Sequence, residues 1–132
     1  RSTCMLLTQH PEINVAACVM GSPAPIKYRE RIAMHAGELG FYLPKDYRQL
    51  TSWLEAYDLS LDPEKVAGRP LFFWHGTEDE KVPYQHTADF IKANPQVNIT
   101  FVSAEERHFV QIATMDQITE FFADNLGISE RT

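Results

Sequence analysis

Two loops that carry titratable side chains each follow an apolar stretch of the sequence. Residues 75–83, HGTEDEKVP, contain Asp79, and residues 103–108, SAEERH, end at His108. A carboxylate that accepts the Nδ1 proton of an imidazole fixes its tautomer, so the other ring nitrogen can act as a base toward a nucleophile. If folding brings them together, Asp79 and His108 could form the acid and base of a catalytic site. A turn-shaping aspartate and a helix-start histidine are the alternatives.

Three short runs rich in apolar, β-branched or aromatic residues are predicted to be strands. They cover residues 15–20, 70–74 and 97–102. The first two are continuous, which is typical of strands buried on both faces of a parallel sheet. The third alternates with polar residues, so we expect one of its faces to be less covered, as at a sheet edge. Ligands of open α/β sheets gather at the carboxyl ends of strands, where the two titratable loops lie.

Helical patterns lie between and around these runs. They cover residues 1–9, 84–94 and 109–126, the last of them followed by Gly127. The last pattern carries one apolar stripe at steps of three and four, formed by Ile112, Met115, Ile118, Phe122 and Leu126. The alternation of strands and helices predicts an α/β fold with a parallel sheet and right-handed crossovers.

The connection between the first two predicted strands is too long for a single helix. It holds two helical patterns, over about residues 26–39 and 45–57, separated from their surroundings by prolines. We interpret about residues 24–60 as a helical cap inserted into one domain that spans residues 1–132. Helices packed on the sheet as ordinary core are the alternative. The apolar face of the insertion would consist of Phe41, Tyr42, Leu43, Trp53, Leu54 and Tyr57.

Composition narrows the class of protein. A chain of 132 residues, with 44% hydrophobic and 23% charged residues, is typical of one globular domain. Its net charge of −6 disfavours nucleic acid or an anionic membrane surface as a partner. Cys4 and Cys18 have neither a disulfide framework nor a zinc-binding spacing, and no secretory signal is visible, so we expect a cytoplasmic location.

The residues around Asp79 carry a resemblance to a known family. Residues 69–83, RPLFFWHGTEDEKVP, resemble the pattern RPLLxxHGxxDxxVP around the catalytic acid of α/β-hydrolases in the prolyl-oligopeptidase and dienelactone-hydrolase branch, especially small bacterial esterases. The resemblance implies that Asp79 is the acid and that His108, after the last strand, is the catalytic histidine. It also implies that His75 packs or hydrogen-bonds the loop backbone. His75, Asp79 and His86 are ligand types that suit zinc, but nothing fixes their geometry, so we predict no metal.

The chain departs from that family in one respect, because it contains no GxSxG motif and its first glycine is Gly21. The resemblance places the nucleophilic serine a few residues before Arg1. We therefore expect the C-terminal part of a serine hydrolase, most simply a carboxylesterase for small acyl esters, that is inactive alone and needs no cofactor. A peptidase of the same fold and a non-catalytic interaction module derived from a hydrolase are the alternatives.

Two further expectations concern what the chain binds. The aromatic side chains Phe41, Tyr42, Trp53 and Tyr57 of the insertion would line the substrate pocket. The first predicted strand would lack a neighbour on one side. Because an uncovered apolar strand edge tends to pair with another copy, we expect the isolated chain to self-associate, as a homodimer in the simplest case.

Overall fold

Three parallel strands form the sheet in the computed structural model, which describes residues 2–40 and 47–127. The strands are β1 (Ala16–Val19), β2 (Leu71–Gly76) and β3 (Ile99–Ala104), in the order β1-β2-β3. The central β2 pairs with Ala16–Val19 on one side and with all of β3 on the other. The predicted parallel sheet is confirmed, with β3 at an edge.

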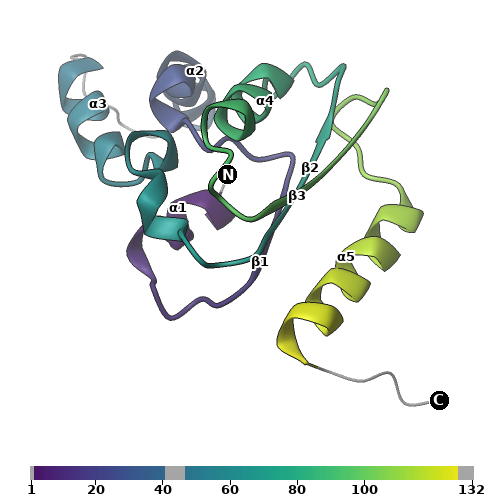
Figure 1. The fold of residues 1–132 in the computed structure, drawn as a ribbon. Helices are drawn as coiled ribbons and strands as arrows, with labels where there is room; N and C mark the ends of the chain where they lie inside the picture. The colour runs from purple at the N-terminus through teal and green to yellow at the C-terminus, as the bar shows by residue number, and fades with distance from the viewer. Residues whose placement is uncertain (1, 41–46, 128–132) are drawn as a thin grey trace.

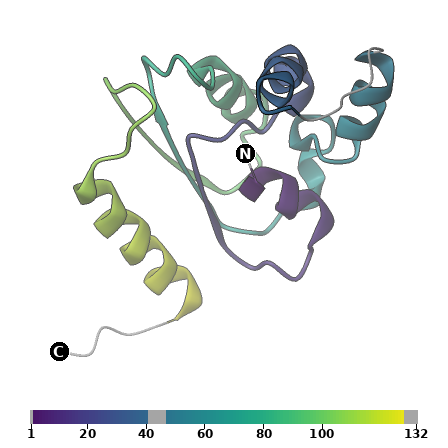
Figure 2. The same ribbon diagram turned by 180° about the vertical axis from the view of Figure 1, so that it is seen from behind.

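Helices cover both faces of the sheet. The helices of the described residues are α1 (Ser2–Gln9), α2 (Arg29–Glu38), α3 (Tyr47–Glu55), α4 (Tyr84–Ala93) and α5 (Ile112–Leu126), with short 3₁₀ turns η1 (Pro25–Tyr28), η2 (Leu59–Leu61) and η3 (Pro63–Val66). Figure 1 shows α1 and α4 on one side of the sheet and α5 on the other, and the view from behind in Figure 2 agrees. Among residues 2–40 and 47–127, no helix has the length and apolar character required to cross a membrane.

Alternate side chains of β2 divide the core into two layers. Leu71 and Phe73 pack with residues of α1 and α4 in one cluster, whereas Phe72 and Trp74 pack with Ile118 of α5 in the other. All six residues of β2 are buried, because helices cover both of its faces. Cys18 is 1% exposed and behaves as the small buried residue that we expected.

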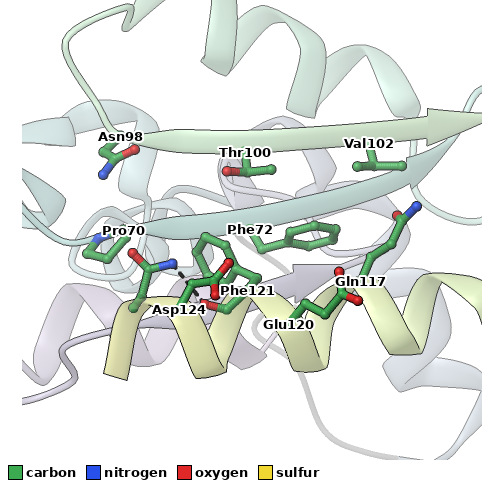
Figure 3. A pocket seen from close by; sticks show the side chains of 10 residues that line it. Pro70, Phe72, Asn98, Thr100, Val102, Gln117, Glu120, Phe121 and Asp124 are labelled. Atoms are coloured by element: carbon green, nitrogen blue, oxygen red, sulfur yellow. Dashed lines mark hydrogen bonds between the residues drawn. The ribbon is translucent and has the colours of Figure 1, made fainter. Parts of the chain in front are cut away.

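The packing of α5 differs from the predicted stripe. Ile118 is buried and Phe122 packs against the sheet, but Ile112, Met115 and Leu126 are exposed. Only the apolar side chains of α5 that face Phe72 and Trp74 are covered, so the apolar stripe extends beyond the buried part of the helix. An open cavity of about 410 Å³ lies between the sheet and α5, and Thr100, Val102, Gln117 and Glu120 are among the residues that line it (Figure 3).

The insertion between β1 and β2 runs from η1 through α2, α3 and η2 to η3, and the predicted inserted helices are confirmed. The buried carboxylate of Asp58 ties its two ends together. Asp58 Oδ2 accepts the backbone N–H of Ile26 at 3.1 Å, and Oδ1 accepts both the backbone N–H and the hydroxyl of Ser60. Phe41, Tyr42 and Leu43 lie outside the described residues.

Candidate active site

Asp79 and His108 meet at the carboxyl ends of two neighbouring strands. His108 Nδ1 lies 2.8 Å from Asp79 Oδ2, although 29 positions separate the residues in the chain. Each side chain stands on a loop that leaves its strand at this edge, where Gly76 of β2 pairs with Ala104 of β3. The structure therefore brings together the two side chains that the sequence singled out.

The carboxylate of Asp79 is buried and held by four groups. Oδ1 accepts the backbone N–H groups of Lys81 and Val82, both at 2.8 Å, while Oδ2 faces His108 and lies 3.3 Å from His75 Nε2. Burial would raise the pKa of Asp79, but the N–H of Val82, the imidazole of His108 and the N–H of Lys81 outweigh it and hold the pKa below its usual value. Asp79 therefore stays ionised, as the orienting partner of a base must.

Contact between the two loops depends on Gly76. The backbone N–H of Thr77 donates to Ala104 O at 2.9 Å, and that of Glu78 donates to Glu106 O at 3.0 Å. A Cβ atom at Gly76 would lie 2.8 Å from the carbonyl carbon of Glu106 and closer still to the carbonyl oxygens of Glu106 and Arg107. Only glycine lets the loops approach closely enough for Asp79 to reach His108.

Gly76→Ala is expected to destabilise the fold by about 3 kcal/mol and to separate Asp79 from His108, because the clashing atoms are backbone and cannot swing aside. Urea unfolding measures the loss. Gly37→Ala in α2 is the matched control: nothing lies within 4 Å of the added methyl group, so it should leave stability unchanged or raise it by up to about 1 kcal/mol. Equal stability of Gly76→Ala and the wild type would contradict the assigned role.

His75 supports the acid from beneath. Its side chain is buried, with Nε2 at 2.8 Å from Val82 O and Nδ1 at 3.0 Å from the hydroxyl oxygen of Thr87. The carbonyl of Val82 requires a donor, so the proton of the neutral ring is assigned to Nε2. The expectation that His75 hydrogen-bonds the loop backbone is confirmed.

Burial of His75 predicts a loss of stability in mild acid. Burial lowers the pKa of His75, although the Val82 carbonyl and Asp79 oppose the shift. Burial likewise lowers the pKa of His86, followed by the charge of Lys27. The unfolded chain takes up these protons near pH 6.5 and the folded chain only at lower pH, so stability present above pH 6.5 declines as the pH falls toward the folded pKa values. The urea midpoint should be lower at pH 5.5 than at pH 7.5.

A pair of variants tests the source of this pH dependence. His86→Gln should reduce the difference between the two midpoints without abolishing it, because His75 remains. His35→Gln, at an exposed position, should leave the difference as it is in the wild type. A midpoint that does not change between the two pH values would contradict the prediction.

The cavity beside His108 is not the one that Trp53 and Tyr57 line. His108 borders a cavity of about 550 Å³ together with Tyr28, Arg31 and Met34 of the insertion. Trp53 and Tyr57 instead border a cavity of about 450 Å³ next to α1. The structure does not bring these two aromatic residues to Asp79 and His108, so their predicted substrate-binding role stays a prediction, as does that of Phe41 and Tyr42 outside the described residues.

Sequence reasoning missed Tyr28, Arg31 and Met34. The signal was present in their spacing of three, which places them along one face of a helix. Within residues 2–40 and 47–127, no three histidine, cysteine or acidic side chains are grouped as metal ligands. His86, for example, faces Ser22 Oγ at 3.1 Å rather than Asp79.

Comparison with known proteins agrees with this architecture. No model of a known protein family matches the chain. A stretch of 87 residues, 64% of this chain, is 39% identical to "Putative esterase YitV" of Bacillus subtilis, of which it covers 34%.

Solved structures resemble the fold over nearly the whole chain. TT1662 from Thermus thermophilus matches 96% of it with a TM-score of 0.67 and 17% identity, and acyl-protein thioesterase 2 of Zea mays matches 94% with a TM-score of 0.52 and 20% identity. Esterase Pf2001 of Pyrococcus furiosus matches 92% with a TM-score of 0.56 and 16% identity.

The chain spans 50%, 51% and 49% of these three structures, about half of each. The parallel sheet, the helices on both of its faces and the helical insertion are thus those of the C-terminal portion of an α/β-hydrolase fold, in a chain whose sequence is similar to that of an esterase.

Proposed function

We propose that this chain supplies the acid and the general base of a serine hydrolase, a carboxylesterase for small acyl esters. The observation that carries the proposal is the 2.8 Å contact between His108 Nδ1 and Asp79 Oδ2 at the carboxyl end of a parallel sheet. The carboxylate is fully covered, whereas 32% of the His108 side chain is exposed. A buried acid beneath an accessible imidazole is the arrangement that general base catalysis requires.

The nucleophile of this proposal lies in the part of the hydrolase that the chain does not span. With Nδ1 bound to Asp79, His108 Nε2 takes the proton of the serine hydroxyl as its oxygen attacks the ester carbonyl. The same nitrogen returns the proton to the departing alcohol, which leaves an acyl-serine. Water then attacks the acyl group and gives its proton to His108 Nε2. The acid product leaves as His108 passes this proton to the serine oxygen, which restores the serine. No cofactor enters these steps.

The names of the relatives support an ester or thioester substrate, and none of the three named enzymes is called a peptidase. We therefore place esterase activity ahead of peptidase activity.

The proposal extends to a cytoplasmic location and to self-association of the isolated chain along β1, which has only β2 as a neighbour among the described strands.

Covalent labelling of the whole protein tests the proposal. A fluorophosphonate probe should label one serine that precedes residues 1–132, and p-nitrophenyl acetate should be hydrolysed much faster than a peptide p-nitroanilide. Residues 1–132 expressed alone should neither label nor hydrolyse the ester. Absence of labelling in the whole protein would indicate the non-catalytic module, and labelling at Ser2 or Cys4 would place the nucleophile within this chain.

A further inference from the structure

Two side chains of the insertion reach the loop that carries the catalytic acid. Tyr28 Oη donates to the carbonyl oxygen of Lys81 at 2.6 Å. Arg31 Nη1 donates to the same oxygen at 3.0 Å and to the carbonyl oxygen of Glu80 at 2.8 Å. Tyr28 is buried, and Arg31 is exposed at the rim of the cavity beside His108. The insertion is therefore attached to the acid loop through backbone carbonyl groups.

These carbonyl groups belong to the two peptide units that bind Asp79. The carbonyl of Glu80 and the N–H of Lys81 lie in one rigid plane, and the carbonyl of Lys81 and the N–H of Val82 lie in the next. Both N–H groups donate to Asp79 Oδ1 at 2.8 Å. In a trans peptide the C=O and N–H bonds point in opposite directions, so a bond that fixes the carbonyl also fixes the direction of the N–H.

We propose that Tyr28 and Arg31 are positioning residues that aim these two peptide N–H groups at Asp79 Oδ1 and thereby leave Oδ2 to His108. A hydrogen bond to each carbonyl also polarises its peptide unit and strengthens the N–H donor. The carboxylate is thus held from the insertion as well as from the sheet, where His75 contacts Oδ2. The inference rests on the proposed function, since it concerns how the acid of that site is oriented.

The arrangement links the insertion to catalysis. Tyr28 and Arg31 line the same cavity as His108, so the side chains that hold the acid loop also border the space open to a substrate. A shift of η1 or α2 would rotate both peptide planes and move the acid.

Kinetics of the whole hydrolase test the proposal with four variants. Tyr28→Phe and Arg31→Met should each lower kcat by about 3- to 10-fold, the equivalent of one hydrogen bond. Arg31→Lys, which keeps a donor and the charge, should recover part of the loss. Arg29→Met is the control: it lies on α2 as well, but its guanidinium donates to Ile26 O within the insertion, and kcat should not change.

Each kcat is divided by the number of sites that a fluorophosphonate titrates. A merely structural role would lower the number of titrated sites and leave the kcat of each site unchanged, and that result would overturn the proposal.

Amide hydrogen exchange provides a readout that does not depend on turnover. Tyr28→Phe should speed exchange at Val82 and leave Lys81 unchanged, because it removes one of the two hydrogen bonds to the carbonyl of Lys81 and none to that of Glu80. Arg31→Met should speed exchange at both residues. Wild-type exchange rates at Val82 and Lys81 in both variants would overturn the inference even if kcat fell. Activity retained after replacement of Asp79 or His108 would instead overturn the proposed function, whatever the exchange rates.

Discussion

Replacing His108 by alanine is expected to lower kcat of the whole hydrolase for p-nitrophenyl acetate by roughly 10⁴- to 10⁶-fold, with a much smaller change in KM. Without the imidazole, the serine proton loses the acceptor that Asp79 orients, and the alcohol must leave unprotonated. The side chain makes its contact with Asp79 through Nδ1 and is partly exposed, so its loss should leave the fold intact.

His35→Ala is the matched control for this experiment. His35 borders the same cavity as His108, but its Nδ1 faces Glu38 on its own helix at 3.5 Å, and both side chains are exposed. This variant should retain kcat close to the wild-type value. A fall of less than about tenfold in His108→Ala would remove His108 from the catalytic machinery.

The sequence predicted the sheet from local pattern, and it predicted that Asp79 and His108 meet from that sheet together with the resemblance of residues 69–83 to a hydrolase motif. Continuous apolar runs specify β1 and β2, and the alternation in the third run specifies an edge strand, whichever residues surround them. Asp79 and His108 stand on the loops that come after β2 and β3. Because parallel strands bring the loops at their carboxyl ends to one edge of the sheet, the two side chains were expected to lie close together.

What the sequence did not predict depends on distances between elements far apart in the chain. The close approach at Gly76 exists only because the backbone of Glu106 crosses it. The exposure of Ile112 depends on which part of α5 packs on Phe72 and Trp74, which no periodicity within α5 encodes. The insertion presents Tyr28 and Arg31 to the acid loop, and not Trp53, because of how η1 and α2 pack on that loop.

Asp79→Asn is expected to lower kcat by about 10⁴-fold, with a smaller loss of stability because the NH₂ group of the asparagine replaces the oxygen that faces His75 Nε2. The reason lies in the two N–H groups of Lys81 and Val82, which require an acceptor at the position of Oδ1. The amide oxygen of the asparagine must therefore occupy that position, and its NH₂ group must point at His108. With the NH₂ group as a donor at the former position of Oδ2, His108 Nδ1 must accept a hydrogen bond. The proton of the neutral ring is then on Nε2. In that tautomer the ring cannot accept the serine proton.

Nitrogen NMR of the His108 ring checks this explanation directly. The proton should reside on Nδ1 in the wild type and on Nε2 in Asp79→Asn, and the asparagine should still fold because it fills the same volume. Asp89→Asn in α4 serves as the control, since the Asp89 carboxylate accepts only from Gln85 on its own helix among the contacts described, and it should alter neither kcat nor the tautomer. If Asp79→Asn kept kcat within about tenfold of the wild type, or if the ring proton stayed on Nδ1, Asp79 would not be the group that sets the state of the base.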